Sequence, residues 1–226
     1  MPSLHFAPEV SAQPLSFLRS SLMGSVDIGP ARSHQRWSLS PSARQSRKEM
    51  LRLALMSSEN RAASALGRHY PGGRAAFIET MNKKAKALRM THTHFADSTG
   101  LSSQNQASAG DLVLMAQAAS QYSLIREFTT TAQRTVSFPQ PRYSLGFVNT
   151  NRLVRAGSWD IELSKTGYTN EAGRCLVMKT RVGDRPLVMV LLNSQGKLTP
   201  VGDATRIKQW LETSNYLALA RRTTSA

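Results

Sequence analysis

Two short motifs in this chain combine residue types that can act together in chemistry. Ser58 and Asn60 flank one residue directly after an apolar helical run, where a hydroxyl and an amide can point into a cleft. Lys165, Thr166 and Gly167 follow one another at the end of an alternating stretch. A lysine beside a hydroxyl offers a clamp for a carboxylate, and a glycine lets a substrate backbone approach the strand. Together, the motifs can clamp a carboxylate, relay a proton and hold an amide.

Each motif also has a simpler structural explanation. Ser58, or Ser57 before it, can cap the next helix, and a Ser-x-Asn triplet occurs by chance in many chains of this size. Lys-Thr-Gly is rarer, but it can be a strand end followed by a turn glycine. His92 and His94 form a His-x-His pair without a convergent Cys, Asp or Glu pattern, so no metal site is expected. The two main motifs therefore carry more weight together than alone.

The elements that must position these residues follow from apolar periodicity and from capping residues. Ser46 is a candidate N-cap with Glu49 three residues later, and the apolar helix that they begin breaks near Ser57. Further helical patterns cover residues 62–70, 75–90, 108–120 and 203–220, and a polar loop is expected over 91–107. Strands are expected over 159–167, 174–182 and 185–193, with the last, continuous in its hydrophobic residues, in the centre. This order predicts an α+β fold in which helices pack on an antiparallel sheet.

The 226-residue chain is strongly basic, because 29 Lys and Arg against 14 Asp and Glu give a formal charge of +15. Long-range attraction favours anionic partners such as nucleic acid, anionic lipid or an acidic cell-wall polymer, although a solvated basic surface fits equally well. No recognised nucleic-acid motif or basic aromatic platform is present. No apolar run approaches the roughly 18 residues that a membrane helix needs, and the single cysteine, Cys175, excludes an intrachain disulfide.

From about Ser46 to about Thr213 the chain resembles the low-molecular-mass penicillin-binding proteins, which are D-alanyl-D-alanine carboxypeptidases and endopeptidases. It is most similar to the endopeptidases. The resemblance rests on the Ser-x-Asn triplet and on the runs HYPGG, SAGDL and KTGYTNEAGRCLV, all in the order of the family. It implies a penicillin-binding-protein/β-lactamase-like α+β domain over residues 46–213, between an irregular segment over 1–45 and a tail over 214–226.

By this resemblance, the catalytic residues are Ser58 and Asn60, and the substrate-binding residues are Lys165, Thr166 and Gly167. Ser58 corresponds to the hydroxyl of the second family motif and Asn60 to an amide that orients the substrate, whereas Lys-Thr-Gly corresponds to the third motif. The resemblance implies a serine-type peptidase that acts on peptidoglycan peptides, takes β-lactams as inhibitors and needs no metal or cofactor. It also implies a periplasmic location, although no secretory signal is visible in the sequence.

The first motif of the family, Ser-x-x-Lys, is not found before the second motif. It would supply a serine nucleophile and a lysine base from one turn of a buried helix. Lys48 is the only lysine before Lys83, and the residue three positions before Lys48 is Gln45. A match over residues 194–197 lies in a turn after the third strand and is interpreted as coincidence. We therefore expect residues 1–45 to be unlike the family, through a truncation, a shifted reading frame or a misassigned start, and the fold to be incomplete there.

Three functions stay open at this point. The first is a serine-type D-Ala-D-Ala peptidase, with the choice between endopeptidase and carboxypeptidase undecided. The second is a catalytically inactive remnant that binds muropeptides or β-lactams weakly through Lys165 and Thr166. The third, from charge alone, is a nucleic-acid-binding protein, which the absence of a recognised motif disfavours. The sequence does not indicate an oligomeric state.

Overall fold

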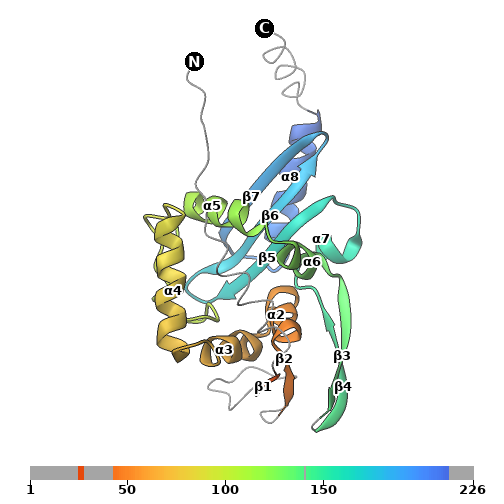
Figure 1. Cartoon of the computed structure of the whole chain (residues 1–226). Helices are drawn as coiled ribbons and strands as arrows, with labels where there is room; N and C mark the ends of the chain where they lie inside the picture. Colours follow the sequence, from red (N-terminus) through yellow and green to blue (C-terminus); the bar gives the residue numbers. More distant parts are fainter. Residues whose placement is uncertain (1–24, 28–42, 140, 214–226) are drawn as a thin grey trace.

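A computed structural model of the chain describes residues 25–27, 43–139 and 141–213 (Figure 1). The helices are α2 (Arg47–Met56), α3 (Asn60–Arg68), α4 (Gly73–Ala87), α5 (Ala109–Ala119), α6 (Ser123–Thr130), α7 (Arg152–Ala156) and α8 (Thr199–Thr213). The strands are β1 (Ser25–Asp27), β2 (Arg44–Ser46), β3 (Gln133–Pro139), β4 (Arg142–Val148), β5 (Ile161–Thr169), β6 (Gly173–Val182) and β7 (Arg185–Ser194).

Strands β5, β6 and β7 form an antiparallel sheet in that order, which places the Lys-Thr-Gly run on β5 at an edge of the described sheet. Lys165 is paired with Val177, and Gly167 with Cys175, across the β5–β6 ladder. The predicted meander is confirmed, but the prediction that its last strand is central is wrong because β6 lies between the other two. Strand β7 contacts both α5 and α8, so its continuous apolar run reflects burial under helices instead of a central position.

Helices cover both faces of this sheet, as the α+β prediction requires. Successive side chains of a strand point to opposite faces. On β6, Met178 packs in a cluster with Ala204 of α8, whereas Lys179 Nζ donates a hydrogen bond of 3.1 Å to Ser120 Oγ at the end of α5. Helices α8 and α5 therefore lie on opposite sides of the sheet. The antiparallel sheet flanked by helices is confirmed.

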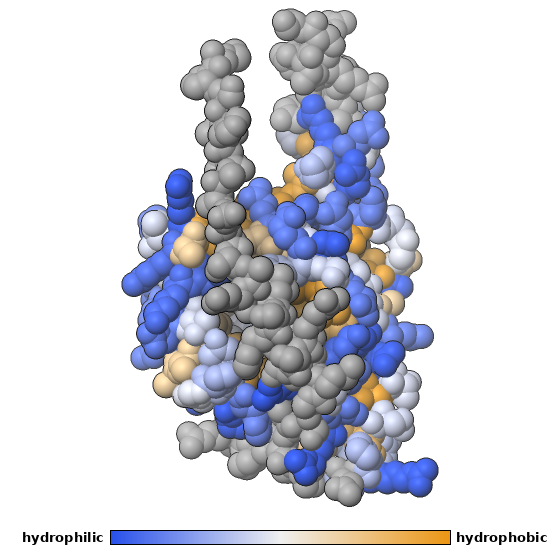
Figure 2. All heavy atoms as spheres, in the orientation of Figure 1, coloured by the Kyte–Doolittle hydropathy of each residue, from blue (hydrophilic) through white to orange (hydrophobic). Residues whose placement is uncertain are grey.

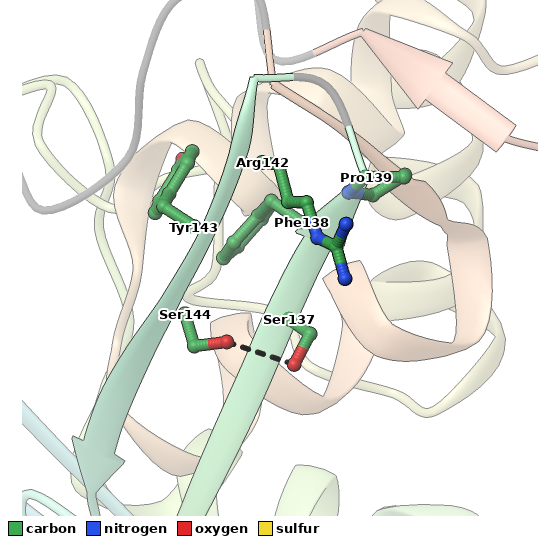
Figure 3. A pocket seen from close by; sticks show the side chains of 6 residues that line it. All are labelled: Ser137, Phe138, Pro139, Arg142, Tyr143 and Ser144. Carbon is green, nitrogen blue, oxygen red and sulfur yellow. Dashed lines mark hydrogen bonds between the residues drawn. The ribbon is translucent and has the colours of Figure 1, made fainter.

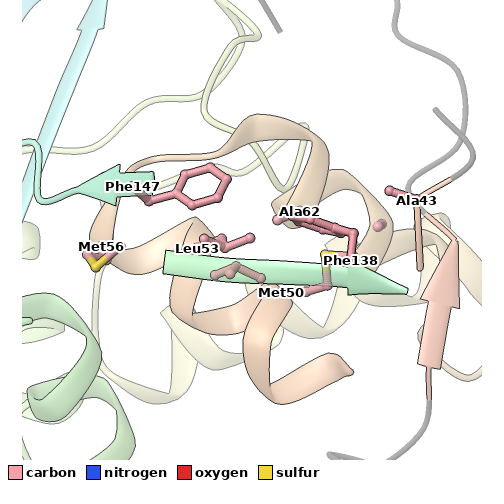
Figure 4. Packing of buried hydrophobic residues seen from close by; sticks show 9 residues of the cluster. Ala43, Met50, Leu53, Met56, Ala62, Phe138 and Phe147 are labelled. Atoms are coloured by element: carbon pink, nitrogen blue, oxygen red, sulfur yellow. The ribbon is translucent and has the colours of Figure 1, made fainter. Parts of the chain in front are cut away.

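Buried side chains form two hydrophobic clusters. The first, here called the α2 cluster, joins α2, α3 and the β3–β4 hairpin (Figure 4): Ala43, Met50, Leu53, Met56, Ala62, Ala65, Val136, Phe138 and Phe147. The second, here called the sheet cluster, joins α7, the sheet and α8: Leu153, Leu176, Met178, Met189 and Ala204. The turn with the Ser-x-Asn triplet follows α2, and the Lys-Thr-Gly run belongs to the sheet. Each motif is thus held in place by a different cluster.

The first helix begins where the sequence predicts, but only half of the predicted capping box forms. Ser46 Oγ accepts a hydrogen bond of 3.2 Å from Glu49 N, which caps α2. The Glu49 side chain does not return this bond, because Ser46 N donates to Gln45 Oε1 instead. The Glu49 carboxylate lies 3.6 Å from Arg52 Nε and also 3.6 Å from Arg134 Nε of β3. It therefore links α2 to the β3–β4 hairpin.

Several elements were not expected from the sequence. Helices α6 and α7 have eight and five residues, and strands β3 and β4 expose most of their side chains, so neither pair has a long apolar pattern. The prediction of irregular structure over residues 1–45 is wrong at two places, where β1 pairs with β2. Both strands are three residues long, which is too short for a periodic signal. Other residues before Ala43, the tail 214–226 and the end of the predicted 203–220 helix lie outside the described residues.

The surface around α4 carries several exposed basic side chains. Lys83, Lys86 and Arg89 are exposed on or just after this helix, and hydrophilic residues dominate the projecting atoms at the α4 edge in Figure 2. Among the described residues, no helix is both long and apolar enough to cross a bilayer.

Removing a side chain from the α2 cluster should destabilise the fold more than removing one from the surface. Leu53 is fully buried, whereas Leu114 of α5 is 38% exposed. We expect Leu53→Ala to lower the free energy of unfolding by ~2–5 kcal/mol, because it removes apolar contacts and leaves a cavity. Leu114→Ala, the matched control, should have a much smaller effect. Urea denaturation followed by circular dichroism measures both, and equal losses would contradict this description of the core.

Candidate active site

The turn between α2 and α3 presents the Ser58 side chain. Ser57 N and Glu59 N both donate hydrogen bonds of 3.1 Å to the carbonyl oxygen of Leu53, one turn back in α2. Between them, Ser58 adopts a left-handed backbone conformation with φ of 53°, which few residues other than glycine favour. Helix α3 then starts at Asn60. The half-buried Ser58 therefore lies in a tight turn of three residues between the two helices.

The two motifs meet at this turn. Lys165 Nζ donates hydrogen bonds to Ser58 Oγ and, over 2.7 Å, to the carbonyl oxygen of Thr166. Ser58 and Lys165 are 107 positions apart in the sequence. The contact joins the turn after α2 to strand β5, and so it bridges the two hydrophobic clusters.

Burial lowers the pKa of the Lys165 ammonium to about 8, from an ordinary value of 10.5. The cause is the loss of solvation, which disfavours the charged form. In the described part of the chain, Nζ donates to a hydroxyl and to a carbonyl oxygen, and no carboxylate forms an ion pair with it. The site therefore holds a lysine amine next to a hydroxyl, and no carboxylate of the described residues neutralises its charge. Such a group can bind an anionic substrate or exchange a proton near neutral pH.

The loop between β4 and α7, which the sequence analysis did not single out, holds the third motif in place through hydrogen bonds. Thr166 Oγ1 donates a hydrogen bond of 2.6 Å to Thr150 Oγ1, and Thr150 N donates one of 3.1 Å to the carbonyl oxygen of Met56 at the end of α2. The next residue, Asn151, is buried and donates over 2.8 Å to Ser164 Oγ on β5. The loop between β4 and α7 therefore ties the end of α2 to the strand that carries Lys165.

Only part of this support had a signal in the sequence. Asn151 caps α7, since its side chain accepts a hydrogen bond from Leu153 N, and asparagine is a favoured residue at such a position. Thr150 has no comparable local signature, because its partners are 16 and 94 positions away (166 minus 150, and 150 minus 56).

Two further predicted residues lie two positions from Ser58 and from Lys165 in the chain. Asn60 is the first residue of α3, two positions after Ser58. Gly167 is exposed on β5, and a Cβ added there would meet Cys175 Cβ at 3.9 Å, an ordinary contact. The protein itself therefore does not require a glycine at position 167.

Other candidate places do not form a comparable site. Among the described residues, no group of three His, Cys, Asp or Glu side chains could hold a metal ion. A hollow of about 550 Å³ lies at the tip of the β3–β4 hairpin (Figure 3), lined by Ser137, Phe138, Pro139, Arg142, Tyr143 and Ser144. The two serine hydroxyls in it bond to each other over 2.9 Å. The residues that line this hollow bring together no base and nucleophile.

Comparison with known proteins identifies the family of this site. The family model of D-alanyl-D-alanine carboxypeptidases, peptidase family S11, matches residues 25–196. The chain belongs to this family. The match begins at residue 25, ahead of the boundary expected at residue 46, and so includes the short β1–β2 pair, which has no periodic pattern. The boundaries proposed for the domain, at residues 46 and 213, stay predictions.

Curated relatives of this S11 family member include two endopeptidases. The chain is 50% identical over 174 residues to the D-alanyl-D-alanine endopeptidase of Pseudomonas aeruginosa, which covers 77% of the chain and 56% of that protein. It is 49% identical over 172 residues to the Escherichia coli enzyme of the same name, which covers 76% of the chain and 56% of that protein. The chain thus spans about half the length of these relatives.

Solved structures of other penicillin-binding proteins share the fold of this S11 family member. A mutant of the Streptomyces K15 DD-transpeptidase matches with a TM-score of 0.75 and 27% identity over 84% of this chain and 79% of that one. Penicillin-binding protein D2 of Listeria monocytogenes, in its cefotaxime-bound form, matches with a TM-score of 0.73 over 87% of this chain and 81% of that one. At 24% identity, the second match supports the fold alone. The predicted penicillin-binding-protein-like fold is confirmed.

The buried amine of Lys165 should leave a signature in the pH dependence of stability. Its pKa is about 8 in the folded chain and close to 10.5 when unfolded. Below pH 8 both states are protonated, and the cost of burying the charge is present in full. Between pH 8 and pH 10.5 the unfolded state binds more protons, so stability rises with pH. Relative to Lys165→Met, the wild-type chain should therefore gain ~1–3 kcal/mol between pH 7 and pH 10.5, a range reduced for partial exposure.

Urea denaturation at several pH values measures this difference. Lys165→Arg is the matched control, because its guanidinium stays charged throughout the range and should show no such gain. Parallel curves for the wild type and both variants would mean that the Lys165 amine is solvated like an exposed lysine.

Proposed function

We propose that this chain carries the substrate site of a serine-type D-Ala-D-Ala peptidase that acts on peptidoglycan peptides. The contact between Lys165 Nζ and Ser58 Oγ carries the proposal, because it brings the second and third family motifs together in one place. We further propose endopeptidase specificity, which is supported by the names of the two relatives that are 50% and 49% identical.

In this proposal, Lys165 binds the terminal carboxylate of the substrate peptide. A charge-assisted hydrogen bond to a carboxylate suits an ammonium that no acidic side chain of the described residues neutralises. Thr166 supplies a second donor. Its hydroxyl donates to Thr150, so it must rotate to donate to the ligand. Thr150 can then accept from another group or from water.

The substrate backbone lies along the free side of β5. An extended peptide can add to a strand edge through main-chain hydrogen bonds, and β5 is paired on one side with β6 only, as far as the described residues show. Gly167 presents no side chain there, so a peptide can approach the backbone closely. Asn60, at the start of α3, orients the amide of the peptide from the opposite side. These roles match those predicted from the sequence and remain proposals.

Ser58 relays a proton to the leaving amine of the substrate. Its hydroxyl accepts a hydrogen bond from the Lys165 amine, whose pKa of about 8 allows the amine to replace the proton that Ser58 gives away. The reaction needs no metal or cofactor. β-Lactams, which carry a carboxylate beside a reactive amide, would compete for the same clamp.

The charge of the chain is consistent with a periplasmic location beside peptidoglycan. A formal charge of +15 attracts carboxylate-rich polymers, and the exposed lysines of α4 supply part of this attraction. Nucleic-acid binding is not favoured, because the family and the site account for the chain without it.

A second candidate function is substrate binding without catalysis. It is favoured by one observation: before Ser58, these 226 residues contain no Ser-x-x-Lys, the motif with the nucleophile of the family. In that case the chain would hold peptides or β-lactams reversibly through Lys165 and Thr166.

Peptide binding tests the proposed site without requiring catalysis. A peptide ending in D-Ala-D-Ala should bind, and Lys165→Met should weaken it by about 10-fold to 100-fold, because a hydrogen bond between charged groups contributes about 1.5–3 kcal/mol. Calorimetric or NMR titration at pH 7 measures the dissociation constants. Lys83→Met, which removes an exposed lysine of α4 with the same net change in charge, is the matched control and should not weaken binding.

The same peptide with a C-terminal amide separates the carboxylate clamp from general attraction. It should bind weakly and equally to the wild-type chain and to Lys165→Met. The proposed role of Lys165 is wrong if the free acid and the amide bind the wild type with the same affinity.

A further inference from the structure

Ser58 has a backbone conformation that is unusual for a serine acting only as a hydrogen-bond partner. Its φ of 53° is one of three positive values among the described residues that are not glycine. Such conformations persist only where the surroundings enforce them, and they gather at functional sites. Here the enforcement is visible, because the amides of Ser57 and Glu59 both bond to the carbonyl of Leu53. The turn that results places the half-buried Ser58 just after the end of α2, where its hydroxyl meets the Lys165 amine.

The neighbouring serine provides an internal contrast. Ser57 Oγ donates a hydrogen bond of 2.9 Å to the carbonyl of Leu53, as expected for a serine that ends a helix. Ser58 Oγ instead accepts a hydrogen bond from the amine of Lys165. Two adjacent serines thus have different environments, one bound to its own helix and one bound to a basic side chain from a distant strand.

Lys165 is held in the position of a base. Its amine has a second fixed partner, the carbonyl oxygen of Thr166 at 2.7 Å, so the Nζ atom cannot swing away from Ser58 without losing that bond. Burial brings its pKa to about 8, at which pH about half of the amine is neutral and can accept a proton. A serine hydroxyl bonded to a lysine amine is one of the recurring arrangements that activate a serine nucleophile.

We propose that Ser58 is itself an acyl-accepting nucleophile in this chain, with Lys165 as its general base, toward strained lactams and activated esters. This goes beyond the proposed function, in which Ser58 only relays a proton. It also provides the chain with a nucleophile that does not depend on a Ser-x-x-Lys motif.

The proposed step is a conventional acyl transfer. Ser58 Oγ attacks the carbonyl carbon of the acyl donor while its proton passes to the neutral Nζ of Lys165. The bond from the carbonyl carbon to the leaving nitrogen or oxygen then breaks, and the leaving group takes the proton from Nζ. The product is an ester on Ser58 with Lys165 neutral again, ready to deprotonate a water molecule that hydrolyses the ester.

Mass spectrometry of the chain after treatment with a fluorescent penicillin and, separately, with p-nitrophenyl acetate tests this inference. Each reagent should add one acyl group, located in the tryptic peptide over residues 53–61. Fragmentation of this peptide should place the group on Ser58, not on Ser57. The rate of p-nitrophenol release should fall by about 100-fold in Lys165→Met, the lower end of the range for loss of a general base.

Variants of the two serines provide the controls. Ser58→Gly removes the hydroxyl and relieves the left-handed backbone, so it should fold at least as well as the wild type and lose the adduct. Ser58→Ala should also lose it. Ser57→Ala should keep both the adduct and its rate. Circular dichroism of each variant establishes that it is folded before labelling is compared.

The possible results separate this inference from the proposed function. A folded wild-type chain without an adduct, an adduct on another residue, or equal labelling of Ser58→Gly would overturn the nucleophile role of Ser58. None of these results affects the binding of a peptide ending in D-Ala-D-Ala, which tests the proposed function by itself. An adduct on Ser58 in a chain that does not bind that peptide would support the nucleophile and reject the substrate class.

Discussion

The hydrogen bond from Lys165 Nζ to Ser58 Oγ is the interaction on which the site depends. It joins residues held by separate hydrophobic clusters, since Ser58 follows α2 and Lys165 lies on β5. Each cluster positions only one of the two polar groups, the hydroxyl or the amine. The burial that accompanies this contact also destabilises the lysine cation, which is why the pKa of Lys165 falls to about 8. The packing that brings Lys165 to Ser58 therefore also lowers the pKa of the lysine amine.

The fold could be predicted where the sequence carries a strong local pattern. The three strands of the sheet and helices α2 to α5 have apolar periodicity or clear caps, and they were placed within a few residues of their observed ends. The position of β7 could not be predicted, because apolar residues on both faces indicate burial but not whether the neighbour is a strand or a helix. The β3–β4 hairpin was missed since only a few of its residues, such as Val136 and Phe138, are buried.

The site could be predicted in its residue types but not in its supports. Ser58 and Lys165 belong to short motifs, and the family resemblance indicated that they should meet. The hydroxyl of Thr150, which accepts the hydrogen bond from Thr166 Oγ1, belongs to a loop with no motif of its own. The left-handed backbone of Ser58 also left no mark, because the Ser57-Ser58-Glu59 sequence is compatible with an ordinary helix cap. Features that arise from long-range hydrogen bonds have no fixed spacing along the chain.

The loop around Thr150 connects the backbone of α2 with the side chains of β5. Thr150 N bonds to the last residue of α2, and Asn151 bonds to Ser164 one position before Lys165. A rigid displacement of α2 would therefore pull this loop and the strand along with it, instead of opening the gap between them. The distance between the Lys165 amine and the Ser58 hydroxyl therefore changes little when α2 moves, because the helix and the strand move together.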